Sequence, residues 1–169
     1  DLISTRAKIF SKLQLDLDLL KKEIGHDYIV ILRMHSFVSE MFEIDQYQGF
    51  VFDYSKGIDI TDLYLMSDIL ITDYSSVFFD YAILKRPILF FTYDIELYRG
   101  KIRGFYFDLE KEAPGPLMMN TNQIVEEIKK IEGLDHKNDQ NYQGFLERFC
   151  YLDDGRSAAK TVEEVFERK

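Results

Sequence analysis

The sequence predicts an α/β fold with a Rossmann-like, three-layer parallel sheet, in a single domain over residues 1–169. Short runs of apolar, β-branched and aromatic residues alternate along the chain with longer segments of helical periodicity. Strands that are apolar throughout are typical of parallel sheets covered by helices on both faces. The chain has 169 residues, 46% hydrophobic and 30% charged, which is the composition of one soluble globular domain.

The first quarter of the chain is predicted to contain one helix and two strands. Apolar residues recur at three- and four-residue spacing over residues 4–24, and Gly25 follows where glycine commonly ends a helix. The β-branched run at 28–34 predicts a buried strand. A polar loop at 45–49 then leads to a second strand at 50–52.

The middle of the chain is predicted to add a short helix, a strand and a longer helix. Thr61 is expected to cap the short helix, which covers 63–66. The third strand covers 69–72, and the next helix begins at Ser75 or Ser76.

The last part of the chain begins with a fourth strand at 87–91, whose first residue is a proline, a position where proline is tolerated. Residues 92–120 are expected to form an extended loop region. Thr121 is expected to cap the first of the helices that follow. These helices cover residues 121–131, 141–150 and 156–168.

Composition excludes several classes of function. The formal net charge of −9 argues against nucleic acid as a partner, because phosphate backbones are bound by clustered Lys and Arg. The single Cys150 cannot form an internal disulfide and is expected to be a buried thiol. No apolar run reaches the ~18 residues of a membrane helix, and no signal peptide is present. Because the chain starts at Asp1, we expect it to be a piece of a longer protein.

Polar residues follow each predicted strand, and ligands of parallel sheets bind beyond the carboxyl ends of the strands. We therefore expect these residues to converge at one edge of the sheet. They are Arg33, His35 and Ser36 after the first strand, Asp53 and Tyr54 after the second, Asp73 to Ser76 after the third, and Thr92 to Asp94 after the fourth.

The run Thr-Asp-Tyr-Ser-Ser from Thr72 to Ser76 carries the strongest chemical signal. Ser75 and Ser76 lie where a strand passes into a helix, and a helix N-terminus offers unpaired N–H groups and the positive end of a dipole. The two hydroxyls fit a diphosphate site that needs no glycine-rich loop. Serine is also favoured as a plain N-cap, and the two roles are compatible.

Three further residues are candidates for ligand contact. Asp80 interrupts an apolar run, and it either accepts a hydrogen bond from a ligand hydroxyl, orients Ser76, or is a solvated helix residue. Arg33 and His35 are expected to point to the same side if the strand pleat continues through them. A guanidinium pairs with phosphate oxygens, and an imidazole donates a hydrogen bond or exchanges a proton. A lone histidine is, however, more often structural.

Arg99, Lys101 and Arg103 form a dense basic patch, which suits a loop that closes over an anionic substrate or a simple solvated loop. Motifs for other chemistries are missing. There is no dinucleotide glycine motif, no Walker-type loop, no G-x-S-x-G elbow and no cysteine or histidine pair at metal-ligand spacing. The sequence therefore predicts no metal and no cofactor.

Taken in order, these pieces resemble the C-terminal domain of the CDP-glycerol glycerophosphotransferase family. The longest match is Ser-Asp-Ile-Leu-Ile-Thr-Asp-Tyr-Ser-Ser-Val at 67–77, with Asp80 after it, and its specific part is the run around Thr72 to Asp80. The shorter matches are Leu-Arg-Met-His at 32–35, Asp-Ile-Thr-Asp-Leu-Tyr at 59–64, Lys-Arg-Pro at 85–87, Arg-Gly-Phe-Tyr at 103–106, Pro-Gly-Pro at 114–116 and Asp-Gly at 154–155. The resemblance covers residues 28–166.

The resemblance implies the C-terminal half of a GT-B glycosyltransferase fold. It implies transfer of glycerol phosphate from CDP-glycerol, or of ribitol phosphate from CDP-ribitol, to a hydroxyl of a lipid-linked polyol-phosphate acceptor in teichoic-acid synthesis. The reaction would take place at the cytoplasmic face of the bacterial membrane, with the enzyme bound peripherally. The family's N-terminal domain, which carries the acceptor site, is not in this sequence, so we expect this chain to bind donor with little or no turnover.

The same resemblance assigns roles to individual residues. The donor-phosphate group comprises Thr72, Asp73, Ser75, Ser76 and Asp80, with Asp80 holding a donor hydroxyl. Arg33 and His35 border the reacting phosphate as catalytic candidates, and Asp59, Thr61 and Arg103 are possible nucleoside or loop contacts. An acceptor hydroxyl then attacks the β-phosphorus in line. CMP leaves, and the serine hydroxyls, the helix N-terminus and His35 stabilise its charge.

Two alternatives remain open at this point. The same strand-end architecture serves the donor half of another GT-B transferase that uses a nucleotide-sugar. It also serves a non-catalytic nucleotide-binding module. A preference for cytidine nucleotides would favour the glycerophosphotransferase family over the first alternative. The presence of a partner domain would favour an enzyme over the second.

Overall fold

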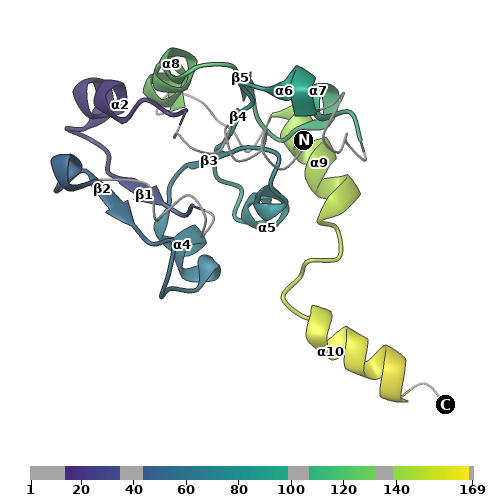
Figure 1. The fold of residues 1–169 in the computed structure, drawn as a ribbon. Coiled ribbons are helices and arrows are strands. Elements are labelled where there is room, and N and C mark those ends of the chain that lie inside the picture. The colour runs from purple at the N-terminus through teal and green to yellow at the C-terminus, as the bar shows by residue number, and fades with distance from the viewer. Residues whose placement is uncertain (1–13, 35–43, 99–106, 132–138, 168–169) are drawn as a thin grey trace, which may run out of the picture. The chain divides into compact units, whose positions relative to one another are not determined.

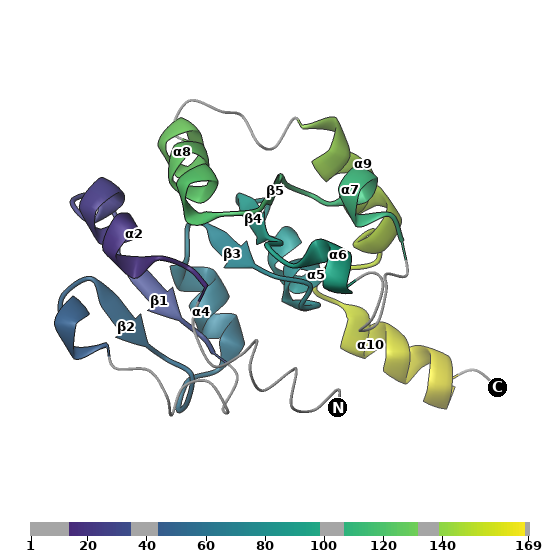
Figure 2. The same ribbon diagram turned by 45° about the horizontal axis from the view of Figure 1, so that its top comes forward.

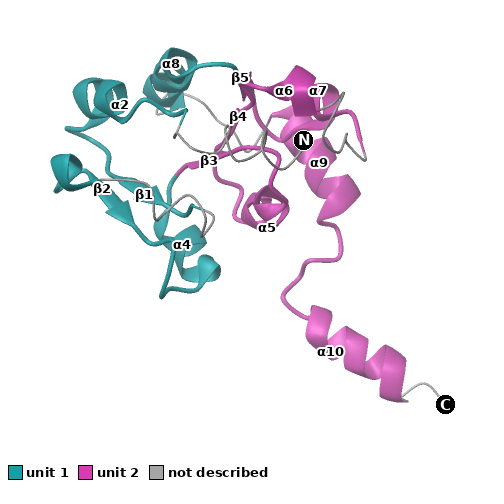
Figure 3. Cartoon of the chain, viewed as in Figure 1, with its two compact units in different colours: residues 1–68, 118–132 teal, residues 69–117, 133–169 magenta. Residues whose placement is uncertain are grey.

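The structure is a computed structural model that describes residues 14–34, 44–98, 107–131 and 139–167 (Figure 1). The chain divides into two compact units (Figure 3). Unit 1 comprises residues 1–68 and 118–132, and unit 2 comprises residues 69–117 and 133–169. Each unit contains its own pair of parallel strands. The prediction of an α/β fold with parallel strands is therefore confirmed.

Unit 1 is built on the parallel strands β1 and β2, with Val30 opposite Val51 and Leu32 opposite Asp53. Its helices α2 and α8 pack side by side, as two views show (Figure 1, Figure 2). Each of these helices buries one apolar stripe at three- and four-residue spacing. The described elements are α2 (Leu17–Ile24), β1 (Val30–Leu32), η1 (Asp45–Tyr47), β2 (Val51–Asp53), α4 (Ile60–Met66) and α8 (Thr121–Ile131).

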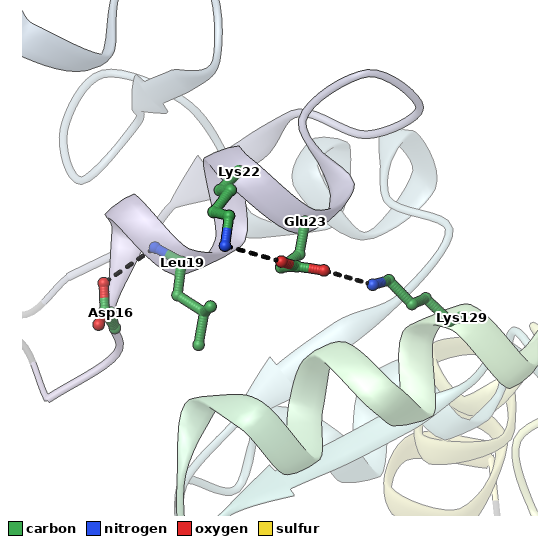
Figure 4. Close-up of polar contacts among 5 residues, drawn as sticks. All are labelled: Asp16, Leu19, Lys22, Glu23 and Lys129. Carbon is green, nitrogen blue, oxygen red and sulfur yellow. Dashed lines mark hydrogen bonds and ion pairs between the residues drawn. The ribbon is translucent and has the colours of Figure 1, made fainter.

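Polar contacts join α2 and α8 at two points, one of them drawn in Figure 4. The Glu23 carboxylate accepts a hydrogen bond from Lys129 Nζ at 2.6 Å and lies 3.5 Å from Lys22 Nζ. The bond from Lys129 holds the pKa of Glu23 below its usual range. At the start of α2, Asp16 Oδ1 accepts from Leu19 N, while Asp16 N donates to Thr121 Oγ1, both at 3.0 Å.

The contact with Asp16 explains why Thr121 does not cap α8 as the sequence predicts. Thr121 is buried, and its hydroxyl is engaged by the Asp16 amide of another segment. Asn120 takes the capping role instead, because its Oδ1 accepts from Gln123 N at 3.1 Å. The helix begins and ends where predicted, and only the residue that caps it differs.

Unit 2 contains a sheet in the order β3-β4-β5, and β3 and β4 are parallel with Leu70 opposite Ile88 and Thr72 opposite Phe90. The elements are β3 (Leu70–Thr72), α5 (Val77–Ala82), β4 (Ile88–Phe91), α6 (Ile95–Leu97), α7 (Leu109–Glu112), β5 (Leu117–Met118, at the boundary with unit 1), α9 (Gln140–Phe149), α10 (Ser157–Val162) and the π-helical turn η4 (Glu163–Glu167). Residues 92–120 are therefore not one extended loop, since their described part holds α6, α7 and β5.

Aromatic rings form the core of unit 2. Phe145 of α9 lies 5.7 Å from Phe78, 5.2 Å from Phe79 and 4.8 Å from Phe149, measured between ring centroids. Cys150 is half-buried beside this cluster, and burial raises the pKa of its thiol. The cluster attaches α9 to α5, the helix that follows the serine pair.

A tyrosine hydroxyl closes the carboxyl end of α5. Tyr142 of α9 is buried, and its hydroxyl donates to the carbonyl oxygens of Ala82 at 3.2 Å and Arg86 at 2.9 Å. Burial raises the pKa of Tyr142 well above its usual range, so the hydroxyl remains a donor. The end of a helix leaves carbonyl groups without intrahelical partners, and Tyr142 supplies one from a distant segment.

A close backbone approach fixes the edge of this sheet. Phe90 N donates to Pro116 O at 3.0 Å, and the neighbouring Gly115 lies against the carbonyl group of Ile88. A Cβ on residue 115 would overlap the Ile88 carbonyl oxygen, which is backbone and cannot rotate away. Only glycine fits at this position.

We predict opposite effects for two glycine substitutions. Gly115→Ala forces β4 and the Gly115 segment apart and should lower the free energy of unfolding by about 1–3 kcal/mol, as overpacking does. Gly144→Ala, on α9 with open space around the position, should raise it by up to about 1 kcal/mol through helix propensity. Urea unfolding of both variants checks this, and equal effects would contradict the close approach at Gly115.

Candidate functional site

The turn after β3 carries the serine pair. Asp73 Oδ1 accepts a hydrogen bond from Ser75 N at 2.9 Å, which closes the turn locally. The Ser75 amide is therefore already paired within the turn, where the sequence suggests an unpaired donor for an anion. Asp73, Ser75 and Ser76 are exposed, whereas Thr72 is buried at the end of the strand.

Ser76 occupies the N-cap position of α5, but its side chain makes no capping hydrogen bond. The plain capping role that competes with ligand binding is thus not realised by this hydroxyl. The helix itself has six residues, so its aligned peptide dipoles are few. An anion at this turn would depend on the serine hydroxyls more than on the dipole.

Asp80 is the fourth residue of α5 and is exposed. Its neighbours along the helix, Phe78 and Tyr81, are buried in the core of unit 2. The apolar run that Asp80 interrupts is therefore a buried helix face with one carboxylate outside it. That position suits contact with solvent or with a ligand equally well.

Tyr74 ties the serine turn to the turn after β4. Its hydroxyl donates to Asp94 Oδ1 at 3.0 Å, and its ring stacks on Tyr98 with centroids 4.0 Å apart. Burial and the Asp94 carboxylate raise the pKa of Tyr74, so its hydroxyl stays protonated. Sequence reasoning places Tyr74 and Asp94 beyond neighbouring strands but does not predict their bond.

Desolvation also affects Asp73. Although Asp73 is exposed as a residue, the protein around its carboxyl group partly shields that group from water, and this desolvation raises its pKa. The nearby Asp94 carboxylate also raises the pKa, while the bond from Ser75 N lowers it. Two carboxyl groups beside the serine turn make it an unfavourable place for additional negative charge unless strong donors compensate. The exposed serine hydroxyls supply hydrogen-bond donors at this turn.

In unit 1, side chains join the ends of β1 and β2. Arg33 Nη1 donates to Tyr54 O at 2.8 Å, and Met34 N donates to Ser55 Oγ at 2.9 Å. The Ser55 amide and hydroxyl both donate to Asp53 Oδ1. Arg33 is exposed, and its bond to Tyr54 O holds the guanidinium group beside the end of β2.

Asp59 and Thr61 form the start of α4, with roles that differ from the prediction. Asp59, and not Thr61, is the N-cap, because its Oδ1 accepts from Thr61 N at 2.8 Å. That backbone bond, with smaller help from Arg33, lowers the pKa of Asp59. Both residues are exposed, and their observed contact is a local cap.

The described site candidates are divided between the two units of the chain. Thr72, Asp73, Ser75, Ser76 and Asp80 belong to unit 2, while Arg33, Asp59 and Thr61 belong to unit 1. His35, Ser36 and Arg103 lie outside the described residues. Among the described residues no set of three His, Cys, Asp or Glu side chains is arranged to hold a metal ion, and none of their helices has the length and apolarity to cross a membrane.

Comparison with known proteins identifies the family. Residues 3–167 match the family described as CDP-Glycerol:Poly(glycerophosphate) glycerophosphotransferase. The chain belongs to this family. The resemblance predicted from the sequence is confirmed. Membership of this family replaces the alternative of a nucleotide-sugar transferase from another family.

Individual relatives agree with this assignment. A teichoic acid poly(glycerol phosphate) polymerase of Bacillus subtilis strain 168 is 56% identical over 92% of this chain, which spans 21% of that protein. A protein of the same description from Bacillus spizizenii strain W23 is 54% identical over 89% of the chain, which spans 38% of it. The chain is thus a homologue of glycerophosphotransferase enzymes and covers well under half of their length.

A solved structure supports the fold. The chain matches a structure of the wall teichoic acid polymerase TagF soaked with CDPG, with a TM-score of 0.83 and 39% identity. The match covers 92% of this chain and 38% of that one. The α/β architecture of this family member therefore corresponds to part of a solved polymerase of the GT-B type.

We predict that Asp73→Asn stabilises the chain at neutral pH. The folded state holds the Asp73 proton more tightly than the unfolded state does. The contribution of this proton to the free energy of unfolding is therefore fully present below the ordinary pKa near 3.8, and it is lost as pH rises through the raised pKa. Asparagine keeps an oxygen for Ser75 N and does not ionise. In thermal unfolding from pH 3 to pH 7, the melting temperature of the variant should rise relative to that of the wild type as pH rises.

The comparison variant for this test is Asp73→Ala, which removes the acceptor as well as the charge. It should be less stable than Asp73→Asn at every pH. A wild-type curve that runs parallel to the Asp73→Asn curve across the whole range would contradict the raised pKa of Asp73.

Proposed function

We propose that this chain is the donor-nucleotide part of a CDP-glycerol glycerophosphotransferase and binds the donor diphosphate at the turn after β3. The observation that carries the proposal is the exposed Ser75–Ser76 pair, whose Ser76 hydroxyl makes no capping bond, in a chain of this family. Hydroxyl groups held at a strand end are suitable donors for phosphoryl oxygens.

In the proposed donor site, the serine hydroxyls donate hydrogen bonds to the diphosphate, and Asp80 accepts one from a hydroxyl of the donor. Thr72 and Asp73 act by holding the turn, because Thr72 is buried and Asp73 is bonded to Ser75 N. This division suits the chemistry, since a carboxylate in direct contact with the diphosphate would repel it.

The proposed reaction is a displacement at the β-phosphorus of CDP-glycerol. The acceptor hydroxyl forms the new phosphate ester as the bond from phosphorus to the bridging oxygen of CMP breaks, and the hydroxyl proton passes to a base. Hydrogen bonds from Ser75 and Ser76 stabilise the charge that develops on the leaving CMP. Arg33 and His35 remain catalytic candidates, while the observed cap at the start of α4 gives Asp59 and Thr61 a structural role that competes with a nucleoside contact.

The acceptor and the cellular location follow from the same proposal. A lipid-linked polyol phosphate would be the acceptor, at the cytoplasmic face of the membrane. The chain spans 21% and 38% of the two relatives described above. We propose that the remaining length of such enzymes supplies the acceptor site and that this chain alone gives little or no transfer. A non-catalytic nucleotide-binding module is the second candidate, and it shares the donor site.

Calorimetric titration of CDP-glycerol into this chain tests the donor site, with CDP-ribitol, CMP and UDP-glucose as competing ligands. The wild type should bind the cytidine diphosphates. A Ser75→Ala/Ser76→Ala variant should bind at least about tenfold more weakly, because a hydrogen bond to a charged group contributes about 1.5–3 kcal/mol.

The control for this experiment is Ser157→Ala, which removes an exposed hydroxyl at the start of α10. It should leave the affinity unchanged, and circular dichroism should show all variants folded. Undiminished binding by the double serine variant contradicts the proposed diphosphate site. Binding of UDP-glucose in preference to CDP-glycerol contradicts the cytidine donor.

A further inference from the structure

The Tyr74 side chain attaches the serine turn to a segment distant in sequence. Within the turn, Asp73 Oδ1 accepts a hydrogen bond from Ser75 N, and the α5 helix that follows has six residues. Tyr74 adds contacts with two residues distant in sequence: its hydroxyl bonds to Asp94 Oδ1 at 3.0 Å, and its ring stacks on Tyr98 at an interplanar angle of 25°.

These partners come from the segment that follows the neighbouring strand. Asp94 is the N-cap residue of α6, and Tyr98 stands at its carboxyl end. Tyr74 therefore connects the turn after β3 with the turn and helix after β4. Because β3 and β4 are hydrogen-bonded in parallel, both segments leave the same edge of one sheet.

The hydrogen bond spans 3.0 Å between the two oxygens, at the long end of the usual range for a hydroxyl donor, and the ring stacking acts together with it. A hydroxyl bond combined with ring stacking restrains both the position and the rotation of the tyrosine, and hence of the peptide units on either side of it. A site for a diphosphate needs donors fixed in advance, since donors that must be ordered on binding lose affinity.

We propose that Tyr74 is a positioning residue that holds the Ser75 and Ser76 hydroxyls ready for the donor diphosphate through its contacts with Asp94 and Tyr98. The inference rests on the proposed donor function of the same turn. In this role Tyr74 acts through the serines and does not itself contact the ligand. Asp94 shares the role, because it supplies the acceptor that fixes the tyrosine.

Variants at both ends of the bond test the inference by calorimetry with CDP-glycerol. Tyr74→Phe keeps the ring and removes the hydroxyl, and it should raise the Kd about tenfold. Asp94→Ala should have a similar effect, whereas Asp94→Asn, which keeps an oxygen acceptor, should restore most of the affinity. In the Tyr74→Phe/Asp94→Ala double variant the effects should not add, because both changes remove one interaction.

Hydrogen exchange provides a readout that needs no ligand. Amides in a peptide spanning residues 73–76 should exchange faster in Tyr74→Phe, while those of α9 keep the wild-type rate. Tyr151→Phe, at a side chain 71% exposed, is the matched control and should change neither exchange nor affinity.

The outcomes separate this inference from the proposed function. If the wild type binds CDP-glycerol and Tyr74→Phe binds it equally well, the positioning role is overturned while the donor site stands. If the wild type binds no cytidine diphosphate, the donor site fails and the ligand-directed role of Tyr74 fails with it. Unchanged exchange at 73–76 in Tyr74→Phe overturns the attachment itself.

Discussion

The parallel pairing of β3 with β4 is the constraint on which unit 2 depends. With Leu70 opposite Ile88 and Thr72 opposite Phe90, the strands end beside each other and deliver two polar turns to one sheet edge. The Tyr74–Asp94 bond requires that arrangement. On the other side of β4, the Gly115 segment approaches the Ile88 carbonyl so closely that no side chain fits. The strand that leads into the exposed serines is thus held by backbone packing on β4.

The strands and the family were predictable because both depend on local sequence. A run such as Ile-Leu-Phe-Phe at 88–91 is apolar on both faces, and that pattern suits a buried parallel strand. The run from Ser67 to Val77 combines such a strand with a hydroxyl-rich turn, and together with the order of the shorter motifs it carried the resemblance to the family. The helix at 121–131 was predictable for the same reason, since its apolar residues follow a helical period.

What the sequence did not predict depends on contacts between distant residues. Thr121 is a good capping residue by type, but the Asp16 amide, 105 positions away, engages its hydroxyl and Asn120 caps the helix. The cap of α4 is an exception, because it is local: Asp59, itself a favoured capping residue, accepts from the Thr61 amide in place of the cap expected of Thr61. The Tyr142 bonds to the end of α5 and the Tyr74–Asp94 bond have no local pattern. Such choices are made by packing, which overrides propensity.

The chain belongs to a family whose description names CDP-glycerol, and our proposal assigns the diphosphate of such a donor to the exposed serine turn before α5. A crystal structure of this chain with CDP-glycerol tests that claim most directly. The account predicts diphosphate oxygens within hydrogen-bonding distance, about 2.5–3.2 Å, of the Ser75 and Ser76 hydroxyls. A bound diphosphate that contacts neither serine would contradict it.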